Sequence, residues 1–341
     1  MKRWHTVLIG LIISAGFLYL SLRQADFGQI IGAFRTARYG YVVLGLAGVV
    51  VTVLVRGLRW SVLTQGRLTV TDGFWLFNVG FLFNNVLPAR LGEFARAYLA
   101  GRRPAMHFTS ALSSIVVERL FDMVAVVVLI GAALLVLPLP ALAVSGGALM
   151  GVLALVGIAA LAAAAHWPQR ALNVGSRLLS LMPRISREAA RDFLQPFVDG
   201  LGGVSEWRTF ALGLGLSIFA WVVSGFAAWL LMLAFWREVP IIVSQLVVAA
   251  AGLGIAIPAA PSGVGPYEAA VIGVLTTLGY NADVSRSFAF ALHGANIIVT
   301  SLLGLLGLMR EGVSFGQVVQ GARTLQAGTP EDEQTAEQIS I

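Results

Sequence analysis

The sequence predicts an all-α membrane protein, a polytopic helical bundle with about six full spans and two broken, re-entrant hairpins. The chain is 57% hydrophobic and only 12% charged, whereas soluble domains average about 25% charged residues. A helix crosses a bilayer with about 20 apolar residues, and windows of this kind recur along the sequence. They lie at residues 6–22, 41–64, 109–137, 141–165, 209–236 and 286–309.

The first window follows a basic N-terminus and resembles a signal peptide. The sequence L-R-Q-A-D at residues 22–26 offers no small-residue cleavage site after it, so we expect a retained first span. The connection at residues 23–40 has the pattern of a short interfacial helix.

Two further apolar windows, 73–99 and 240–278, are interrupted by proline, glycine and charged residues. Residues 83–96 read F-N-N-V-L-P-A-R-L-G-E-F-A-R, and residues 257–268 read I-P-A-A-P-S-G-V-G-P-Y-E. A charged side chain at the centre of a membrane helix costs about 2.5–3.5 kcal/mol on insertion scales. Broken helices are tolerated there only where they are buried in protein or line a wet cavity. We interpret each window as a re-entrant hairpin; one or two full spans are the open alternative.

The order span, broken hairpin, span occurs twice, in residues 41–137 and in residues 209–309. Three spans separate the two hairpins, and because this number is odd, the second hairpin enters from the opposite face. Such a topology is typical of the inverted repeats of secondary transporters, whose broken helices meet near the bilayer midplane. The sequence therefore predicts an inverted repeat in which the hairpins are two halves of a transport site.

The arginine distribution predicts the orientation, since cytoplasmic loops carry an excess of Lys and Arg. Six arginines lie in the loop at residues 166–208, which places this loop and both termini on the cytoplasmic side of a bacterial-type inner membrane. The arginines of residues 23–40 fall on the outer side and disagree with this assignment. Residues 1–310 are expected to form one integral membrane domain, and residues 311–341 a disordered acidic tail with few large apolar residues.

The first hairpin carries the candidate substrate-binding residues Asn84, Asn85, Arg90, Glu93 and Arg96. The last three recur every third residue, on one side of the helix expected after the proline. A guanidinium group binds phosphate in a bidentate manner, so the two arginines suit a phosphate headgroup. The asparagines, at the expected tip, can serve broken backbone groups or a ligand. The alternative is a solvated amphipathic helix on the cytoplasmic surface.

Two spans carry charged residues at a similar expected depth. Arg56 and Arg59 lie near the end of the second span, while Glu118, Arg119 and Asp122 lie about two to three turns into the window 109–137. Glu118 and Asp122 share one helix face because they are four residues apart. We expect a supporting polar network with an Arg59–Glu118 or Arg59–Asp122 ion pair. The alternative for the arginines is snorkelling to the interface.

The second hairpin carries a candidate gate on the opposite side of the pathway. Its glutamate opens a new helix, where the helix dipole alone would stabilise the charge. The functional alternative is a protonatable group or gate that His293 and Asn296 of the last span could face, although a lone membrane histidine is more often a packed, hydrogen-bonded residue. The candidate gate residues are Pro258, Pro261, Gly263, Gly265 and Glu268.

Several classes of chemistry are excluded. The chain has no cysteine and four scattered histidines, so we expect no disulfide and no metal site. No H-E-x-x-H, Walker or dinucleotide-binding motif occurs, so we expect no cofactor and no ATP-driven pump. Ser262, Gly263 and His293 resemble an intramembrane serine protease, but Ala260 stands where its Gly-x-Ser-Gly context needs glycine, and we expect no enzyme. We interpret the net charge of +6 as contact with anionic lipid, not with nucleic acid.

Four motifs follow one another along the chain. They read R-G-L-R-W at 56–60, N-N-V-L-P-A-R-L-G-E-F-A-R at 84–96, V-E-R-L-F-D at 117–122 and P-S-G-V-G-P-Y-E at 261–268. In this order they resemble the flippase-like family, which is also named for the transmembrane domain of lysylphosphatidylglycerol synthase. The resemblance covers nearly the whole chain up to the tail.

The resemblance implies a role in moving lipid, since the best-known members are linked to moving aminoacylated phospholipid between leaflets. Those members also carry a soluble aminoacyl transferase domain, and the short tail here predicts a stand-alone membrane domain. The expected function is a lipid transporter or flippase-like protein that moves or binds a phosphate-headgroup lipid, either a membrane phospholipid or a polyprenyl phosphate. The alternative is a non-transporting lipid-binding subunit that assists a separate lipid synthase or glycosyltransferase.

Overall fold

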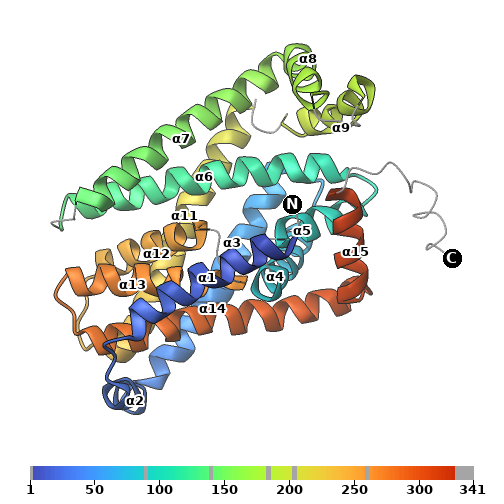
Figure 1. Cartoon of the computed structure of the whole chain (residues 1–341). Coiled ribbons are helices and arrows are strands. Elements are labelled where there is room, and N and C mark those ends of the chain that lie inside the picture. The colour runs from blue at the N-terminus through green and yellow to red at the C-terminus, as the bar shows by residue number, and fades with distance from the viewer. Residues whose placement is uncertain are drawn as a thin grey trace.

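Helices make up the chain in a computed structural model that describes residues 3–87, 91–137, 141–181, 186–201, 206–257 and 261–326 (Figure 1). Over these residues the chain contains no strand, which confirms the predicted all-α membrane bundle. Each of the six predicted spans is a long helix whose bounds differ from the predicted window by a few residues. The helices are α1 Arg3–Leu22, α3 Tyr39–Leu63, α6 Phe108–Leu134, α7 Ala141–His166, α11 Trp207–Phe235 and α14 Ala282–Glu311.

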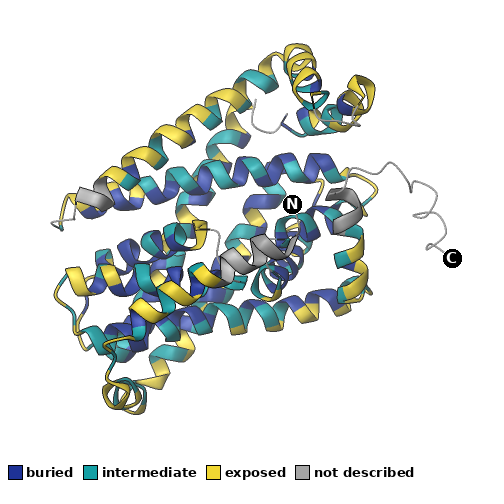
Figure 2. Cartoon of the chain, viewed as in Figure 1, coloured by how far each residue is buried: buried dark blue, intermediate teal, exposed yellow. Residues whose placement is uncertain are grey.

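Many residues of the long helices are exposed (Figure 2), and a large number of these residues are apolar. On α7, Leu149, Leu153, Leu155 and Val156 are each more than half exposed. Such a continuous apolar surface is unfavourable in water and is expected where a protein contacts lipid tails. In the described residues, α3, α7, α11 and α14 meet the length and hydropathy of a membrane span, and the molecule is an integral membrane protein.

Each broken window folds back on itself as two short helices. α4 (Val70–Val86) packs against α5 (Gly92–Gly101), and α12 (Ile241–Ala256) packs against α13 (Pro266–Thr277). α4 and α12 have 17 and 16 residues, which makes each about 25 Å long. Because this is shorter than the hydrocarbon core of about 30 Å, the geometry favours re-entrant hairpins over full spans.

In each hairpin, glycine allows the two helical arms to pack closely against each other. A Cβ atom on Gly92 would overlap the carbonyl oxygen of Gly80, and a Cβ atom on Gly254 would overlap the carbonyl oxygen of Pro266. The two arms of each hairpin therefore touch through their backbones, an approach that a larger residue at either position would prevent.

The base of the first hairpin lies beside the C-terminal end of α14. Arg103, after α5, bridges Asp72 of α4 and Glu311 of α14 with N–O distances of 3.1 and 2.8 Å. The hydrogen bond to Glu311 is the main reason why the pKa of the Arg103 guanidinium is raised above its usual value. Arg310 adds a hydrogen bond of 3.5 Å to the carbonyl oxygen of Thr71.

The base of the second hairpin lies at the N-terminal end of α14, because α13 leads into that helix through residues 278–281 (Figure 1). α14 has 30 residues and is about 45 Å long. The tips of both hairpins contact the middle of this helix and each other, through α4 and the 3-10 turn η2 (Pro261–Gly263). This arrangement is the one expected for hairpins that enter from opposite faces; the repeat and the membrane orientation stay predictions.

The connection at residues 23–40 contains α2 (Phe27–Arg35), which has no buried residue. Asp26 caps this helix by accepting hydrogen bonds from the backbone N–H groups of Gln29 and Gly28 at 3.2 and 2.8 Å. These bonds, with that of Gln29 first, lower the pKa of the Asp26 carboxyl. The short helix predicted here is present, and its place at the interface stays a prediction.

The loop at residues 166–208 forms two helices, α8 (Pro168–Leu179) and α9 (Arg187–Gly200), which pack against each other. α9 also packs against α6, where Ser110 Oγ donates a hydrogen bond of 2.7 Å to the carbonyl oxygen of Pro196. The arginine-rich loop is therefore attached to the helix that carries the predicted polar network.

The prediction of disorder after residue 310 is wrong for α15 (Phe315–Gln326). The Phe315 ring stacks on Phe83 with centroids 4.3 Å apart, and Val318 is fully buried. Two apolar residues spaced by three positions place one face of a short helix on the first hairpin, and this contact was not visible in the overall composition. Residues 327–341 lie outside the described residues.

Candidate functional site

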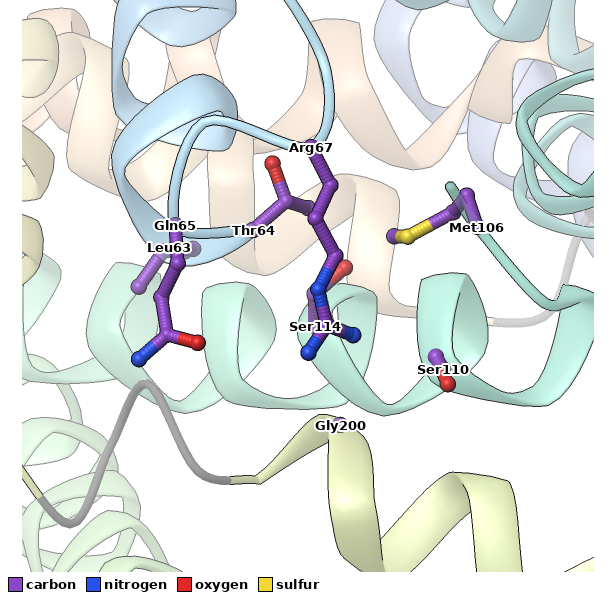
Figure 3. A pocket seen from close by; sticks show the side chains of 8 residues that line it. All are labelled: Leu63, Thr64, Gln65, Arg67, Met106, Ser110, Ser114 and Gly200. Carbon is purple, nitrogen blue, oxygen red and sulfur yellow. The ribbon is translucent and has the colours of Figure 1, made fainter. Parts of the chain in front are cut away.

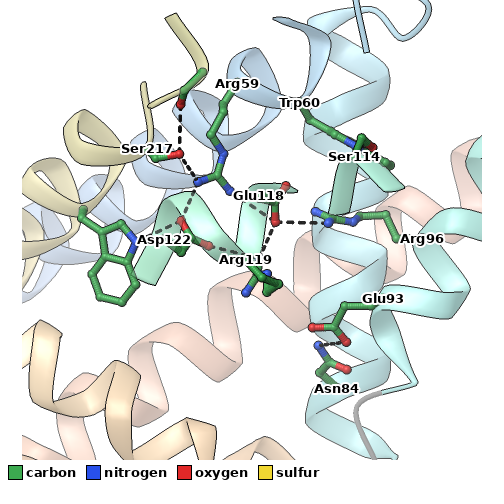
Figure 4. A network of polar contacts seen from close by, with 12 residues as sticks. Arg59, Trp60, Asn84, Glu93, Arg96, Ser114, Glu118, Arg119, Asp122 and Ser217 are labelled. Atoms are coloured by element: carbon green, nitrogen blue, oxygen red, sulfur yellow. Dashed lines mark hydrogen bonds and ion pairs between the residues drawn. The ribbon is translucent and has the colours of Figure 1, made fainter. Parts of the chain in front are cut away.

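Arginine and carboxylate side chains form a cluster where α3, α5, α6 and α11 meet (Figure 4). Arg59 Nη1 lies 2.5 Å from Asp122 Oδ1, and Arg59 Nη2 lies 3.2 Å from Glu118 Oε1. The side chains of Arg59 and Glu118 are both 0% exposed. The two pairs that the sequence offered as alternatives are therefore both present, joined by one arginine.

α11 supplies hydrogen bonds to this ion-paired group. Arg59 Nη1 donates to Ser217 Oγ at 2.9 Å, and Trp221 Nε1 donates to Asp122 Oδ1 at 3.0 Å. Charges removed from water need such partners, because ion pairing alone does not offset their desolvation.

Arg96 extends the cluster into the first hairpin. Its Nη2 atom lies 3.1 Å from Glu118 Oε1, and its guanidinium carbon lies 4.4 Å and 3.9 Å from the ring centroids of Trp60 and Phe77. Trp60 Nε1 is held in turn by Ser114 Oγ at 2.9 Å. Because Arg96 is buried and its charge is paired, the structure favours an anchoring role over the headgroup contact that the sequence predicted for it.

Arg119 lies at the edge of the cluster. It contacts Glu118, and its Nη2 atom lies 3.3 Å from Asp122 Oδ2. Its side chain is 43% exposed, so its guanidinium keeps donors that a further anion can reach.

Arg56 lies beside this edge without an ion-pair partner among the described residues. Its guanidinium carbon lies 5.7 Å and 5.9 Å from the ring centroids of Phe81 and Trp221. Its buried Nε atom has no hydrogen-bond partner in the described part of the chain. Four arginines thus surround two ion-paired carboxylates, which leaves the cluster with an excess of positive charge.

The tip of the first hairpin uses Asn84 to bind its own backbone. Asn84 Oδ1 accepts a hydrogen bond from Gly92 N at 2.8 Å, and Asn84 Nδ2 lies 3.4 Å from Glu93 Oε2. Glu93 is half-buried and has no ion pair with a described residue. Arg90 and Pro258 lie outside the described residues, so their predicted roles stay predictions.

Asn85 turns away from the arginine cluster and toward the second hairpin. Its Nδ2 atom donates to Thr300 Oγ1 at 3.1 Å and to Ser301 Oγ at 3.0 Å. Its Oδ1 atom accepts a hydrogen bond of 3.2 Å from Ser262 Oγ. The predicted substrate-binding residues are therefore divided between two places, and Asn85 joins the two hairpins.

Glu268 and His293 form a buried pair next to this contact. His293 Nδ1 lies 2.6 Å from Glu268 Oε1, and His293 Nε2 lies 3.0 Å from Ser262 Oγ. Glu268 Oε2 accepts a hydrogen bond of 2.7 Å from Gly265 N, and the Tyr267 ring stacks on the imidazole with centroids 4.0 Å apart.

The other predicted gate residues shape the turn that presents Ser262. Pro261 opens η2, and Ser262, Gly263 and Gly265 have φ angles of +60°, +74° and +97°. Glycine adopts this region without strain, whereas serine does so at a cost. The turn thus holds Ser262 toward Asn85 and His293.

Sequence reasoning missed Ser262, Thr300 and Ser301 as partners of the hairpin tip. His293 and Thr300 are seven residues apart on α14, a spacing that places them on one helix face, and this is the signal that could have found them. Asn296, which we expected near Glu268, donates instead to the carbonyl oxygen of Leu292 at 2.8 Å.

Two hollows lie elsewhere on the molecule. A cavity of about 10 Å³ between α6, α9 and the α3–α4 connection is lined in part by Arg67, Ser110 and Ser114 (Figure 3) and has the size of about one water. A larger one of about 510 Å³ lies at the end of α11, around Arg237 and Glu238. In the described residues, no three potential metal ligands lie together.

Comparisons with known proteins extend these observations. The family model described as the lysylphosphatidylglycerol synthase TM region matches residues 7–304, which include both hairpins and the arginine cluster. No solved structure matches the chain.

Two curated proteins are similar to this chain. One is the glycosyltransferase AglD of Haloferax volcanii, 26% identical over 94% of this chain and 57% of the relative. The other is a UPF0104 membrane protein of Methanothermobacter thermautotrophicus, 23% identical over 82% of this chain and 85% of the relative. The chain therefore spans little more than half the length of the archaeal glycosyltransferase that it resembles.

Proposed function

The chain belongs to the lysylphosphatidylglycerol synthase TM region family, and we propose that it is a lipid transporter that moves a phosphate-headgroup lipid between the leaflets of the inner membrane. The lipid is a phospholipid or a polyprenyl phosphate. Both termini lie in the cytoplasm under this proposal, as the arginines of residues 166–208 predict.

The excess of positive charge in the arginine cluster supports this proposal most. Ionisable residues inside a membrane protein are expensive, and they mark substrate or ion pathways. Here Arg59 and Arg96 are already paired with buried carboxylates, whereas Arg56 has no such partner and Arg119 is 43% exposed. A lipid phosphate brings the negative charge and the acceptor oxygens that Arg56 lacks, and it can reach the exposed part of Arg119 beside that residue's own ion pairs.

The first hairpin also contributes residues to this site. Asn84 and Glu93 lie at its tip, next to the cluster. Glu93 acts as a charge that repels the phosphate and promotes its release, while Arg90 remains a candidate for a further phosphate contact.

The second hairpin contributes the opposite gate. Its tip contacts the first hairpin at the middle of α14, where transporters with broken helices bind their substrates. No ATP-binding motif occurs in the sequence, so the energy for movement comes from an ion gradient or from the lipid gradient. No covalent bond of the lipid is made or broken.

The similarity to AglD favours a second candidate function. The chain matches 57% of a protein named a glycosyltransferase, so a membrane part of this kind can accompany a glycosyltransferase. In this alternative, the chain binds a lipid and presents it to a separate synthase or glycosyltransferase without moving it.

Leaflet exchange in vesicles tests the proposal. Purified protein is reconstituted with labelled phospholipid or labelled polyprenyl phosphate, beside empty vesicles and an Arg119→Gln variant. We expect protein-dependent exchange that falls about tenfold or more in the variant, because a charge-assisted contact contributes about 1.5–3 kcal/mol. Arg177→Gln, a change on the exposed face of α8, is the matched control and should exchange normally.

The outcome separates the two candidate functions. No exchange of any lipid tested, with lipid still bound to wild-type protein and lost from Arg119→Gln, would support the accessory subunit. Equal exchange by wild type and by Arg119→Gln would place the binding site elsewhere.

A further inference from the structure

A chain of hydrogen bonds crosses from the first hairpin to the second at the middle of α14. It runs from Asn85 through Ser262 and His293 to Glu268. We propose that Glu268 and His293 together bind one proton, and that release of this proton breaks the contact between the hairpins. This inference deepens the proposed function, since it names the proton as the ion that is coupled to hairpin movement.

Thr300 fixes the orientation of the Asn85 amide. The Thr300 hydroxyl donates its one hydrogen to the carbonyl oxygen of Asn296 at 2.7 Å, so toward Asn85 its oxygen can only accept. The amide nitrogen of Asn85 must therefore face Thr300, and it also donates to Ser301. Consequently, the amide oxygen of Asn85 faces Ser262 and needs a donor there.

The Ser262 hydroxyl is that donor. It has a single hydrogen, which goes to Asn85 Oδ1 at 3.2 Å. At the 3.0 Å contact between Ser262 and His293 Nε2, the hydrogen must therefore come from the imidazole, and Nε2 carries a proton.

The second imidazole nitrogen then defines the proton site. His293 Nδ1 and Glu268 Oε1 are 2.6 Å apart, a distance at which two lone pairs repel and a shared hydrogen is required. With Nε2 already protonated, this shared hydrogen makes the pair neutral overall, as an imidazolium with a carboxylate or as an imidazole with a carboxylic acid.

Loss of one proton reverses the donor and the acceptor in the hydrogen bond between Ser262 and His293. The remaining imidazole hydrogen stays on Nδ1, where it faces the Glu268 carboxylate, and Nε2 becomes an acceptor. Ser262 then donates to Nε2, and Asn85 Oδ1 loses its donor. The contact between the hairpin tips is thus made in the protonated state and broken in the deprotonated state.

The surroundings keep the pair fixed while Ser262 reorients. Gly265 N holds Glu268 Oε2 at 2.7 Å, and Tyr267 stacks on the imidazole. α13 supplies the titratable groups that face His293, namely Glu268 and Tyr267, while α4 and η2 supply the neutral Asn85 and Ser262. Among the described residues of α2, α3 and α11, which also pack on α14, none forms an ion pair with His293.

The same three groups stand in the order of a serine hydrolase triad, with Ser262 in the nucleophile's position. A triad serine gives its hydrogen to the histidine, whereas in the protonated state the hydrogen of Ser262 goes to Asn85. In that state Ser262 is therefore not arranged as an activated nucleophile.

Spin-label distances across the hairpin tips test the inference without any lipid movement. Because the chain has no cysteine, the substitutions Val86→Cys and Ile257→Cys place two labels at positions that are 53% and 37% exposed. Distances are measured in the full chain in nanodiscs from about pH 5 to about pH 9, so that both states of the proposed proton site are sampled. We expect the distribution to lengthen or broaden in one step as the pH rises.

Two variants should abolish this step in opposite ways. In Glu268→Gln, the amide always donates to His293 Nδ1, so Nε2 keeps its hydrogen and the short distance persists at every pH. In Ser262→Ala, the link is absent, and the long distance is present at every pH. His166→Gln, in which a histidine at the end of α7 is replaced, should keep the wild-type step.

A wild-type distribution that is constant over the pH range overturns the inference, as does a wild-type step that persists in Glu268→Gln. Each of the two variants tests the inference by itself. If one of them does not fold, as judged by its elution as a single species, the other variant is used. The spin-label distances do not depend on lipid exchange. A protein that shows the pH-dependent step but moves no lipid would therefore contradict the proposed function and leave this inference standing.

Discussion

Asn85 accepts a hydrogen bond of 3.2 Å from Ser262, a residue 177 positions further along the chain. This contact joins the tips of two hairpins whose bases lie at opposite ends of α14. One hydrogen bond therefore reports whether the two hairpin tips touch at the middle of α14.

Replacing Asn85 by alanine should lower the stability of the purified protein. The change leaves Thr300, Ser301 and Ser262 without their common partner, and an unsatisfied buried polar group costs about 1–3 kcal/mol. The free energy of unfolding in detergent is the measurement. The control is Ser301→Ala, which removes one of these bonds and should have a smaller effect; equal stability of wild type and Asn85→Ala would contradict the contact.

Much of the fold was predictable from the sequence because membrane burial leaves a local signal. Each span is a continuous apolar window, and each hairpin is an apolar window with proline and glycine inside it. The Arg59 ion pairs were predictable too, since matched depth on two helices is enough to bring opposite charges together. α15 was missed because the burial of Val318 depends on a distant surface that the tail composition does not reveal.

The candidate site was only partly predictable, because the sequence does not show in which direction each side chain points at a hairpin tip. Asn84 and Asn85 are adjacent in sequence but point to different partners, one to Gly92 and one to Ser262. The sequence also treated Arg96 as exposed to a ligand, whereas packing against two aromatic rings buries it. These differences arise from tertiary packing, which no local spacing rule contains.

Arg59→Met should be far more destabilising than Arg119→Gln. The first change leaves Glu118 and Asp122 without their central cation, and breaking a buried pair costs about 3–5 kcal/mol. The second removes a side chain that is 43% exposed, and exposed pairs contribute about 1 kcal/mol or less. Parallel unfolding curves of the two variants check the difference, and a larger loss in Arg119→Gln would reverse our assignment of their roles.

Arg56→Gln should reduce lipid exchange while the protein stays folded. Arg56 has no carboxylate partner among the described residues and rests against Phe81 and Trp221, so its charge is available to a phosphate. We expect exchange to fall about tenfold or more, with an unchanged elution profile. Arg56→Lys is the informative companion, because an ammonium keeps the charge but lacks the bidentate fork; an effect on folding but not on exchange would show that Arg56 is structural.

Glu93→Gln should abolish lipid exchange without unfolding the protein. Glu93 is half-buried at the tip of the first hairpin and has no ion pair with a described residue, so stability depends little on its charge. The amide keeps the contact with Asn84 and removes only the negative charge. Exchange in vesicles and the elution profile are measured together, and full exchange at normal expression would remove Glu93 from the site.

Gly92→Ala should disrupt the first hairpin, whereas Gly131→Ala should not. A Cβ atom on Gly92 would overlap the carbonyl oxygen of Gly80 and the side chain of Asn84, so the two arms of the hairpin must separate. Overpacking of this kind costs about 1–3 kcal/mol or more, and we expect a lower unfolding temperature together with lost exchange. Gly131, in the last turn of α6, has open space around its Cβ position, so an alanine fits there without a clash. Thermal unfolding of both variants against wild type decides the matter: equal behaviour of the two would mean that the arms of the hairpin do not touch at Gly92.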